Sequence, residues 1–285
     1  MDSERRNFLR NAGGMLAAGV LLGARAVPRV APSWPVPTAR LGQLGLQLYT
    51  VRSLMDRDVE GTIADVAKIG YKEVELAGLH DKTADEMRAI LDRHGIRARS
   101  SHSSMQDIRR NWDRTLDDAA TLGQTYIVNP WIDEPERTAA GYTKAAHEMT
   151  VAAEAARKRG IGFAYHNHDF EFAPVDGRLG YDILLAESDP ALVKMELDIF
   201  WIVKGGQDPL RYFAQHAGRF PMIHAKDITG DGRMVDVGKG TIDWPRIFRH
   251  AKRAGLEYTF VEHDEPPSPI ADAQTSFAYL HALTF

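Results

Sequence analysis

The sequence predicts a single-domain (β/α)8 TIM barrel over residues 43–285. From Leu44 onward, eight short apolar runs alternate with helical segments, which is the pattern of parallel strands joined by helical crossovers. Eight such units over about 240 residues also match the usual size of this barrel, about 250 residues. A doubly wound open sheet is the alternative. It usually has a glycine-rich turn after its first strand, and residues 48–52 contain no glycine.

The first half of the barrel is expected to supply strands at residues 44–49, 73–76, 96–100 and 125–128. Helices are expected at 59–69 and 105–122, with a further helix between them. Thr83 followed by Glu86 predicts the start of that middle helix, because the two side chains can form a capping box. Gly95 is expected to end it.

The second half is expected to supply strands at 161–166, 193–197, 222–225 and 258–262. Helices are expected at 139–159, 181–186, 209–216 and 271–283, with another after Asp243. Asp208 followed by Pro209 indicates a helix start, because proline is tolerated at the first helical position. Asp176 and Gly177 indicate a hairpin turn, and the glycine-rich segment 227–243 is expected to be a loop.

The composition excludes several classes of function. The chain is 44% hydrophobic and 26% charged, which is ordinary for a soluble globular protein. Its formal net charge of −4 gives no basic face, so no nucleic-acid partner is expected. There is no cysteine, which excludes disulfides, thiolate nucleophiles and cysteine-type zinc sites. The 11 histidines can supply metal ligands or proton carriers.

Residues 1–26 contain the three parts of an export signal in the right order. Arg5 and Arg6 form a twin-arginine pattern, an apolar run follows at 12–23, and residues 24–26 form an A-x-A-like cleavage site. The run is shorter than the roughly 20 residues of a spanning helix, so no stable membrane anchor is expected. We expect recognition by the twin-arginine export machinery and a periplasmic or secreted protein; an uncleaved anchor is the alternative. Residues 27–42, with four prolines, are expected to be an extended linker.

The most informative residues for function are polar groups at the ends of the later strands. Asp198, His224 and Glu262 each end or directly follow a hydrophobic strand, and barrels of this kind carry their function at the carboxyl ends of the strands. A buried carboxylate is costly unless it is compensated, and a divalent cation compensates it. Carboxylates with an imidazole suit Mn²⁺, which we favour, or Mg²⁺, Co²⁺ or Zn²⁺. Alternatively, each residue is a helix cap or half of an ion pair.

Other strand ends carry polar and aromatic side chains as well. His102 is either part of a pocket wall or a structural histidine, and Trp131 and Trp201 either stack on a sugar ring or pack in the core or rim. The complete set of such residues is Gln47, Tyr49, Glu75, His102, Asn129, Trp131, His166, His168, Glu171, Asp198, His224, Lys226, Glu262 and His263.

Five segments resemble the xylose-isomerase-like TIM-barrel superfamily, and within it the twin-arginine-exported sugar phosphate isomerase/epimerase branch. They are YHNHDFE (165–171), ELDIFW (196–201), IHAKD (223–227), GKGTID (238–243) and VEHD (261–264). The resemblance covers the chain from Leu44 onward. It implies one divalent metal ion held by Glu, Asp, His and Glu at the fifth to eighth strands, which correspond here to Glu171, Asp198, His224 and Glu262. Many relatives have the first Glu directly at the strand end, where this chain has His166, so His166 and His168 are alternatives to Glu171.

The resemblance also implies the chemistry. A metal-dependent sugar isomerase or epimerase removes a proton beside a carbonyl and stabilises the enediolate that forms. Glu171 and Glu262 are the candidate proton carriers, and His168 and Lys226 are candidates to polarise oxygens or carry protons. The expected substrate-binding residues are His102, His166, Trp131 and Trp201.

We expect an unphosphorylated sugar or keto-sugar as substrate, because the chain has no phosphate-binding glycine loop. The first alternative is a lyase or hydrolase of 3-keto-glycosides or a cyclitol dehydratase, since the same enediolate permits β-elimination. The second is a periplasmic sugar-binding protein without activity. A homo-oligomer is left open.

Overall fold

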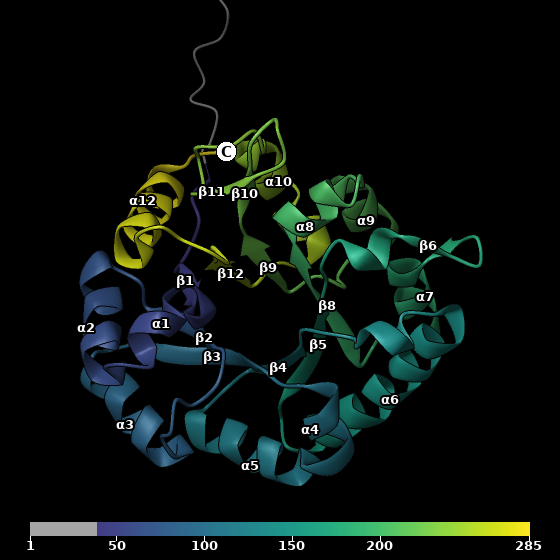
Figure 1. The fold of residues 1–285 in the computed structure, drawn as a ribbon, viewed down its shortest axis with the longest axis horizontal. Coiled ribbons are helices and arrows are strands. Elements are labelled where there is room, and N and C mark those ends of the chain that lie inside the picture. The colour runs from purple at the N-terminus through teal and green to yellow at the C-terminus, as the bar shows by residue number, and fades with distance from the viewer. Residues whose placement is uncertain (1–38) are drawn as a thin grey trace, which may run out of the picture. The chain divides into compact units, whose positions relative to one another are not determined.

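A computed structural model describes residues 39–285 and confirms the predicted barrel. Eight parallel strands close in the order β1-β12-β9-β8-β5-β4-β3-β2 (Figure 1). Their bounds are β1 Gly45–Gln47, β2 Glu73–Leu76, β3 Arg97–His102, β4 Tyr126–Asn129, β5 Gly162–His166, β8 Val193–Asp198, β9 Met222–Ala225 and β12 Tyr258–Val261. Two antiparallel pairs lie outside the barrel, β6 Pro174–Val175 with β7 Arg178–Leu179, and β10 Asp227–Ile228 with β11 Met234–Val235.

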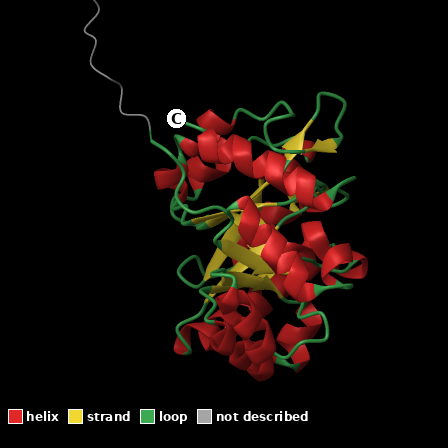
Figure 2. Cartoon of the chain, turned by 90° about the vertical axis from the view of Figure 1, so that its left-hand side faces the viewer, coloured by secondary structure: helices red, strands yellow, loops and turns green. Residues whose placement is uncertain are grey.

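Helices surround the strands on the outside, as the side view in Figure 2 also shows. They are α1 Arg52–Met55, α2 Val59–Ile69, α3 Ala84–Arg93, α4 Met105–Arg110, α5 Trp112–Leu122, α6 Ala139–Lys158, α7 Gly180–Glu187, α8 Ile199–Lys204, α9 Pro209–Gln215, α10 Trp244–Phe248, α11 Ala251–Ala254 and α12 Pro269–Ala282. Short 3-10 helices occupy Leu48–Val51, Glu134–Glu136 and Phe170–Phe172. Within residues 39–285, no helix combines the length and apolar character needed to cross a membrane.

Local sequence signals set many of the helix ends. Thr83 and Glu86 form the predicted capping box at the start of α3, with Glu86 N donating to Thr83 Oγ1 at 3.2 Å and Thr83 N donating to Glu86 at 2.8 Å. Asp208 caps α9 ahead of Pro209. These side chains satisfy backbone N–H groups that have no partner inside the helix.

Several helices differ from the sequence-based prediction: α1 was not predicted, and the single helix expected after Asp243 is split into α10 and α11. The expected helix at 105–122 is broken into α4 and α5 at Asn111, a residue type whose side chain competes for backbone hydrogen bonds and disfavours helix interiors. The short helix α8 was not predicted. It begins directly at the end of β8, where Asp198 Oδ1 accepts a hydrogen bond from Trp201 N at 2.9 Å.

The inside of the barrel below the strand ends is apolar. Val128, Ala164, Met222 and Phe260 form a separate buried cluster. All four come from barrel strands and no helix residue belongs to the cluster, so it fills the space inside the barrel. Gly45 is required by this packing, because a Cβ atom there would lie 2.4 Å from Phe260 Cδ1. The polar side chains at the carboxyl ends of the strands gather above this layer, whereas Glu73 and Arg99, near the amino ends of β2 and β3, form a separate ion pair.

Strand register arranges those polar side chains in two levels. Asp198 is paired with His224 across β8 and β9, and Glu196 is paired with His166 across β5 and β8. Since side chains alternate faces along a strand, Glu196 and Asp198 point to the same side. The barrel thus holds one acidic level directly beneath another.

The two ends of the described chain meet. Ala39 and Phe285 exchange backbone hydrogen bonds of 3.0 and 3.1 Å, and Arg40 forms an antiparallel bridge with Thr284. Residues 39–42, the end of the predicted linker, are thus joined to the carboxyl terminus. The predicted signal peptide at 1–26 and the rest of the linker lie outside the described residues.

Candidate metal centre and active-site cavity

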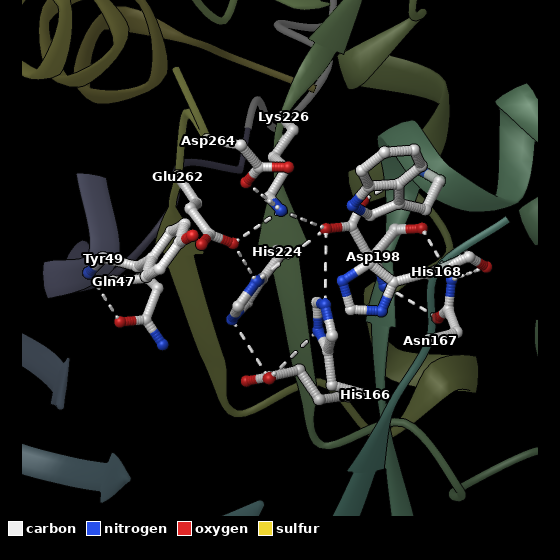
Figure 3. Close-up of polar contacts among 12 residues, drawn as sticks. Gln47, Tyr49, His166, Asn167, His168, Asp198, His224, Lys226, Glu262 and Asp264 are labelled. Carbon is white, nitrogen blue, oxygen red and sulfur yellow. Dashed lines mark hydrogen bonds and ion pairs between the residues drawn. The ribbon is translucent and has the colours of Figure 1, made fainter. Parts of the chain in front are cut away.

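Asp198, His224 and Glu262 come together at the carboxyl ends of β8, β9 and β12, as predicted from the sequence (Figure 3). One ligand atom of each lies within 4.8 Å of the others. His224 Nδ1 is 2.6 Å from Glu262 Oε2 and 3.8 Å from Asp198 Oδ2. We call these three residues the cavity-face group.

The cavity-face group suits a divalent cation. Asp198 Oδ2, Glu262 Oε2 and His224 Nδ1 are buried, and their closest contacts among the described residues are with one another and with the Lys226 ammonium. A divalent cation could take the place of these contacts, because it compensates buried carboxylates. Two carboxylate oxygens and one imidazole nitrogen match Mn²⁺, Mg²⁺, Co²⁺ or Zn²⁺. Asp198 is therefore both a helix cap, through Oδ1, and a candidate metal ligand, through Oδ2.

Lys226 supplies the positive charge beside this group. Its Nζ lies 3.0 Å from Asp198 Oδ2, 2.7 Å from Glu262 Oε2 and 2.7 Å from Asp264 Oδ1. Burial opposes the charge of Lys226, but these three carboxylates outweigh burial and raise its pKa well above the usual value. Burial raises the pKa of Asp198 to about 6. Burial acts in the same direction on Glu262, but Lys226 and His224 outweigh it and lower the pKa of Glu262.

A second group of acids and imidazoles lies on the other side of His224. Its Nε2 is 2.7 Å from Glu75 Oε1 and 3.0 Å from Glu196 Oε2. His102 Nε2 approaches the same two oxygens at 2.9 and 3.4 Å, and His166 Nδ1 is 3.4 Å from Glu196 Oε2. We call Glu75, His102, His166 and Glu196, around Nε2 of His224, the floor group.

The charges of the floor group depend on this packing. Burial alone would lower the pKa of His102, but Glu75 and Glu196 outweigh it and raise that pKa to about 9. Burial, followed by the neighbouring imidazoles and the Lys226 ammonium, lowers the pKa of His166 well below its usual value, so His166 is neutral. A neutral imidazole is the form that binds metal ions.

Glu171 is placed elsewhere. Its Oε1 accepts a hydrogen bond from Tyr165 and its Oε2 accepts one from His168 N at 2.8 Å. It belongs to neither ligand group, so the structure does not bring it to the ligands as the resemblance implied. Of the three candidates after β5, His166 lies nearest, with Nε2 3.9 Å from Asp198 Oδ2. Burial raises the pKa of Glu171 to about 8.

A cavity of about 540 Å³ opens above the cavity-face group. It is lined by Tyr49, His102, Pro130, Trp131, Arg137, His166, His168, Asp169, Phe170, Trp201, Lys226, Glu262 and Asp264. The predicted substrate-binding residues His102, His166, Trp131 and Trp201 all line it, as do His168, Lys226 and Glu262.

Aromatic side chains form the mouth of the cavity. Trp131 is 43% exposed and Tyr49 is 41% exposed; within residues 39–285 they are two of the three exposed large hydrophobic side chains. The Arg137 guanidinium lies 3.5 Å from the ring centre of Phe170 and 4.5 Å from that of Trp131. The mouth is therefore apolar and carries one cation, whereas the base of the cavity is acidic.

Asp227, in the IHAKD segment, has a structural role. Its buried carboxylate accepts hydrogen bonds from Trp244 Nε1 at 2.9 Å, Gly238 N at 2.9 Å and Ile242 N at 3.2 Å. These bonds shape the loop between β9 and α10. The GKGTID segment thus serves to wrap backbone N–H groups around Asp227.

Sequence reasoning missed Glu196 and gave no role to Glu75, Tyr49, Arg137 or Asp264. Glu196 had a usable signal, because it lies two residues before Asp198 and so shares its face of the strand. Arg137 had none, since it lies in a connection whose path the sequence does not predict.

A closed (β/α)8 barrel with a cavity and acidic side chains at the carboxyl ends of its strands has the architecture of the barrel enzymes. The xylose isomerase-like TIM barrel family model matches residues 63–283, so the chain belongs to that family. The family predicted from the five segments is confirmed.

The curated relatives include a catabolism protein and a dehydratase. The chain is 21% identical to the rhizopine catabolism protein MocC of Rhizobium meliloti, covering 75% of this chain and 77% of that protein. It is 22% identical to an inosose dehydratase of Lacticaseibacillus casei, covering 78% of this chain and 89% of that protein.

Solved structures share the whole barrel. A sugar phosphate isomerase/epimerase from Parabacteroides distasonis ATCC 8503 superposes with a TM-score of 0.76 at 26% identity, covering 86% of this chain and 95% of that chain. The IOLI protein, solved with a zinc atom, superposes with a TM-score of 0.67 at 18% identity, covering 83% of this chain and 96% of that chain. The 3-keto-D-glucoside 4-epimerase YcjR from E. coli superposes with a TM-score of 0.67 at 15% identity, covering 85% of this chain and 100% of that chain. The last two likenesses show the fold alone.

Proposed function

We propose that this chain is a divalent-metal-dependent isomerase or epimerase of an unphosphorylated sugar or keto-sugar, acting by proton abstraction beside a carbonyl. The observation that carries the proposal is the convergence of Asp198, His224 and Glu262 next to Lys226 at the base of the cavity. Asp198, His224 and Glu262 would hold the ion, with His166 as a fourth ligand. A bound divalent ion there would polarise the carbonyl and neighbouring hydroxyl oxygens of a sugar.

The protein's own residues have separable tasks in this reaction. Lys226 is a buried ammonium that lines the cavity, so it can donate a hydrogen bond to the substrate oxygen that gains negative charge. Burial lowers the pKa of His168 to about 3, so this ring is neutral and can accept a hydrogen bond from a substrate hydroxyl. Of the acid–base pair predicted from the sequence, Glu262 lines the cavity and Glu171 does not. We therefore keep Glu262 as the proton carrier, assign His168 to hold a substrate hydroxyl, and give Glu171 the role of holding the His168 loop.

A solvent-deuterium experiment tests the proposal. Metal-loaded protein would be incubated with a panel of aldoses, ketoses and 3-keto-sugars in D₂O, and exchange of carbon-bound protons followed by NMR. We expect exchange beside the carbonyl with at least one substrate class, and its loss in Glu262→Gln. Binding of these sugars without any exchange would instead support the sugar-binding protein and reject the enzyme.

A keto-glycoside lyase or cyclitol dehydratase is the second candidate, and the aromatic mouth favours it. Trp131 and Tyr49 leave apolar surface for a second ring beyond the sugar that contacts Glu262. The same proton abstraction then expels a group from the neighbouring carbon. Product analysis separates the two reactions, because only elimination releases an aglycone or water.

We also propose that the chain is exported by the twin-arginine route. The support is the order of the three signal parts in residues 1–26. Changing both Arg5 and Arg6 to Lys in an expressing bacterium should leave the full-length chain in the cytoplasm. Periplasmic, shortened protein from that variant would contradict the proposal.

A further inference from the structure

We infer that the floor group is a second divalent-cation site, distinct from the cavity-face group and joined to it through the other nitrogen of His224. The donor atoms are Nε2 of His102, Nδ1 of His166, Oε2 of Glu196 and Nε2 of His224, with Glu75 Oε1 beside them. The inference does not depend on the reaction proposed above, because it concerns which ions the protein holds.

The spacing of the donor atoms is that of a coordination shell. With metal–ligand distances of about 2.0–2.2 Å, neighbouring ligands of one ion lie about 3.0–3.5 Å apart. Glu196 Oε2 lies 3.0 Å from His224 Nε2, 3.4 Å from His102 Nε2 and 3.4 Å from His166 Nδ1. One carboxylate oxygen is thus surrounded by three imidazole nitrogens supplied by β3, β5 and β9.

Hydrogen bonding alone does not account for this group. His166 is 1% exposed, and its Nδ1 has no hydrogen-bond partner among the described residues although it faces Glu196. Glu75 Oε1 already accepts from Gln47 Nε2 at 2.7 Å and faces both His102 and His224. In a network that served only hydrogen bonding, a buried nitrogen such as His166 Nδ1 would have a partner.

The charge and chemistry of the group select the ion. Glu75 and Glu196 together carry two negative charges, which one divalent cation balances. Three imidazole nitrogens with carboxylate oxygen suit Zn²⁺ or Co²⁺ better than Mg²⁺, which prefers oxygen ligands alone. The cavity-face group offers two carboxylates and remains the harder of the two sites even with His166 Nε2 as its fourth ligand, so we expect the floor group to take Zn²⁺.

His224 connects the two sites. Its Nδ1 faces the cavity-face group and its Nε2 faces the floor group. With both sites occupied, His224 would hold one ion at each ring nitrogen, which requires both nitrogens to be free of protons.

Zinc stoichiometry in matched variants tests this inference. The full chain would be stripped with a chelator, titrated with Zn²⁺ against a chromophoric competitor, and its bound zinc measured after gel filtration. We expect two equivalents in the unaltered protein and one in Glu196→Gln. Glu262→Gln should also hold one, in the other site, and X-ray absorption of that zinc should show a histidine-rich shell.

Two controls keep the result interpretable. Glu73→Gln alters another buried carboxylate of β2, one that pairs with Arg99 at 2.7 Å, and it should keep both equivalents. His102→Gln removes a less buried floor ligand, so it carries the test if Glu196→Gln fails to fold. The inference is overturned if the unaltered protein binds only one zinc, and that zinc is lost in Glu262→Gln but kept in both Glu196→Gln and His102→Gln. If Glu196→Gln and His102→Gln instead remove the single zinc and Glu262→Gln keeps it, the zinc lies in the floor site and the proposed catalytic centre is rejected.

Discussion

The ammonium of Lys226 lies 2.7 Å from Glu262 Oε2, and both side chains are buried at the base of the cavity. The same ammonium contacts Asp198, the other carboxylate of the cavity-face group. Lys226 therefore balances the negative charge that a divalent ion would also balance. It also lines the cavity.

Removing the charge of Lys226 should separate these two roles. In Lys226→Met we expect divalent affinity to rise at least about tenfold, because a competing cation is lost, while turnover falls by about 100-fold or more. The metal-free variant should lose about 3–5 kcal/mol of stability, since buried carboxylates are left uncompensated. Mn²⁺ titration, turnover and urea unfolding measure the three effects. Lys239→Met, which removes a largely exposed lysine paired with Asp236, is the control. Weaker Mn²⁺ binding in Lys226→Met would contradict this account.

Glu171 should make stability depend on pH. Burial raises its pKa in the folded state from the ordinary value of 4.5 to about 8, so between these pH values the folded state holds a proton that the unfolded state has lost. The protonated Glu171 side chain therefore contributes its full share to the free energy of unfolding below about pH 4.5, and this contribution is lost as pH rises through about 8. We expect Glu171→Gln to flatten this part of the profile in urea unfolding at pH 5, 7 and 9. The exposed Glu154→Gln is the control, and an unchanged slope in Glu171→Gln would show that Glu171 does not cause it.

Asp227 should matter for stability and not for metal binding. Asp227→Asn turns one carboxylate oxygen into an amide and breaks part of the set of bonds from Gly238, Ile242 and Trp244. Buried unsatisfied groups cost about 1–3 kcal/mol each, so we expect a loss of about 2–4 kcal/mol in urea unfolding and little change in Mn²⁺ affinity. Asp231→Asn, an exposed change in the same loop, should have little effect. Lost metal binding at normal stability would instead make Asp227 a ligand.

Trp131 should affect substrate binding and little else. It is 43% exposed at the mouth, so Trp131→Ala should change stability only slightly. Stacking on an aromatic ring contributes about 0.5–1.5 kcal/mol, which corresponds to about 2–13-fold in KM with kcat nearly unchanged. Steady-state kinetics on a substrate with a second ring measures this. Val151→Ala, the exposed hydrophobic residue away from the cavity, should leave KM unchanged. If kcat and kcat/KM fell equally in Trp131→Ala, Trp131 would act in the chemical step and not in substrate binding.

The sequence by itself determined the barrel and three members of the cavity-face group. Strand and helix periodicity is local information, and a carboxylate or imidazole after an apolar strand end is visible without coordinates, as at Asp198, His224 and Glu262. Capping pairs such as Thr83 and Glu86 are local for the same reason. The family resemblance rested on segments that this local pattern already marked.

Only the tertiary structure decided which strand ends share a site and on which level. Register placed His166 beside Glu196 and Asp198 beside His224, and barrel closure brought Glu75 from β2 to within 2.7 Å of His224 on β9. The sequence also could not separate Glu171 from His166 as the residue near the metal ligands. The four residues between them lead into a 3-10 helix, where Glu171 bonds to Tyr165 and His168. Distances between residues far apart in the chain depend on closure of the whole barrel, and no local pattern encodes them.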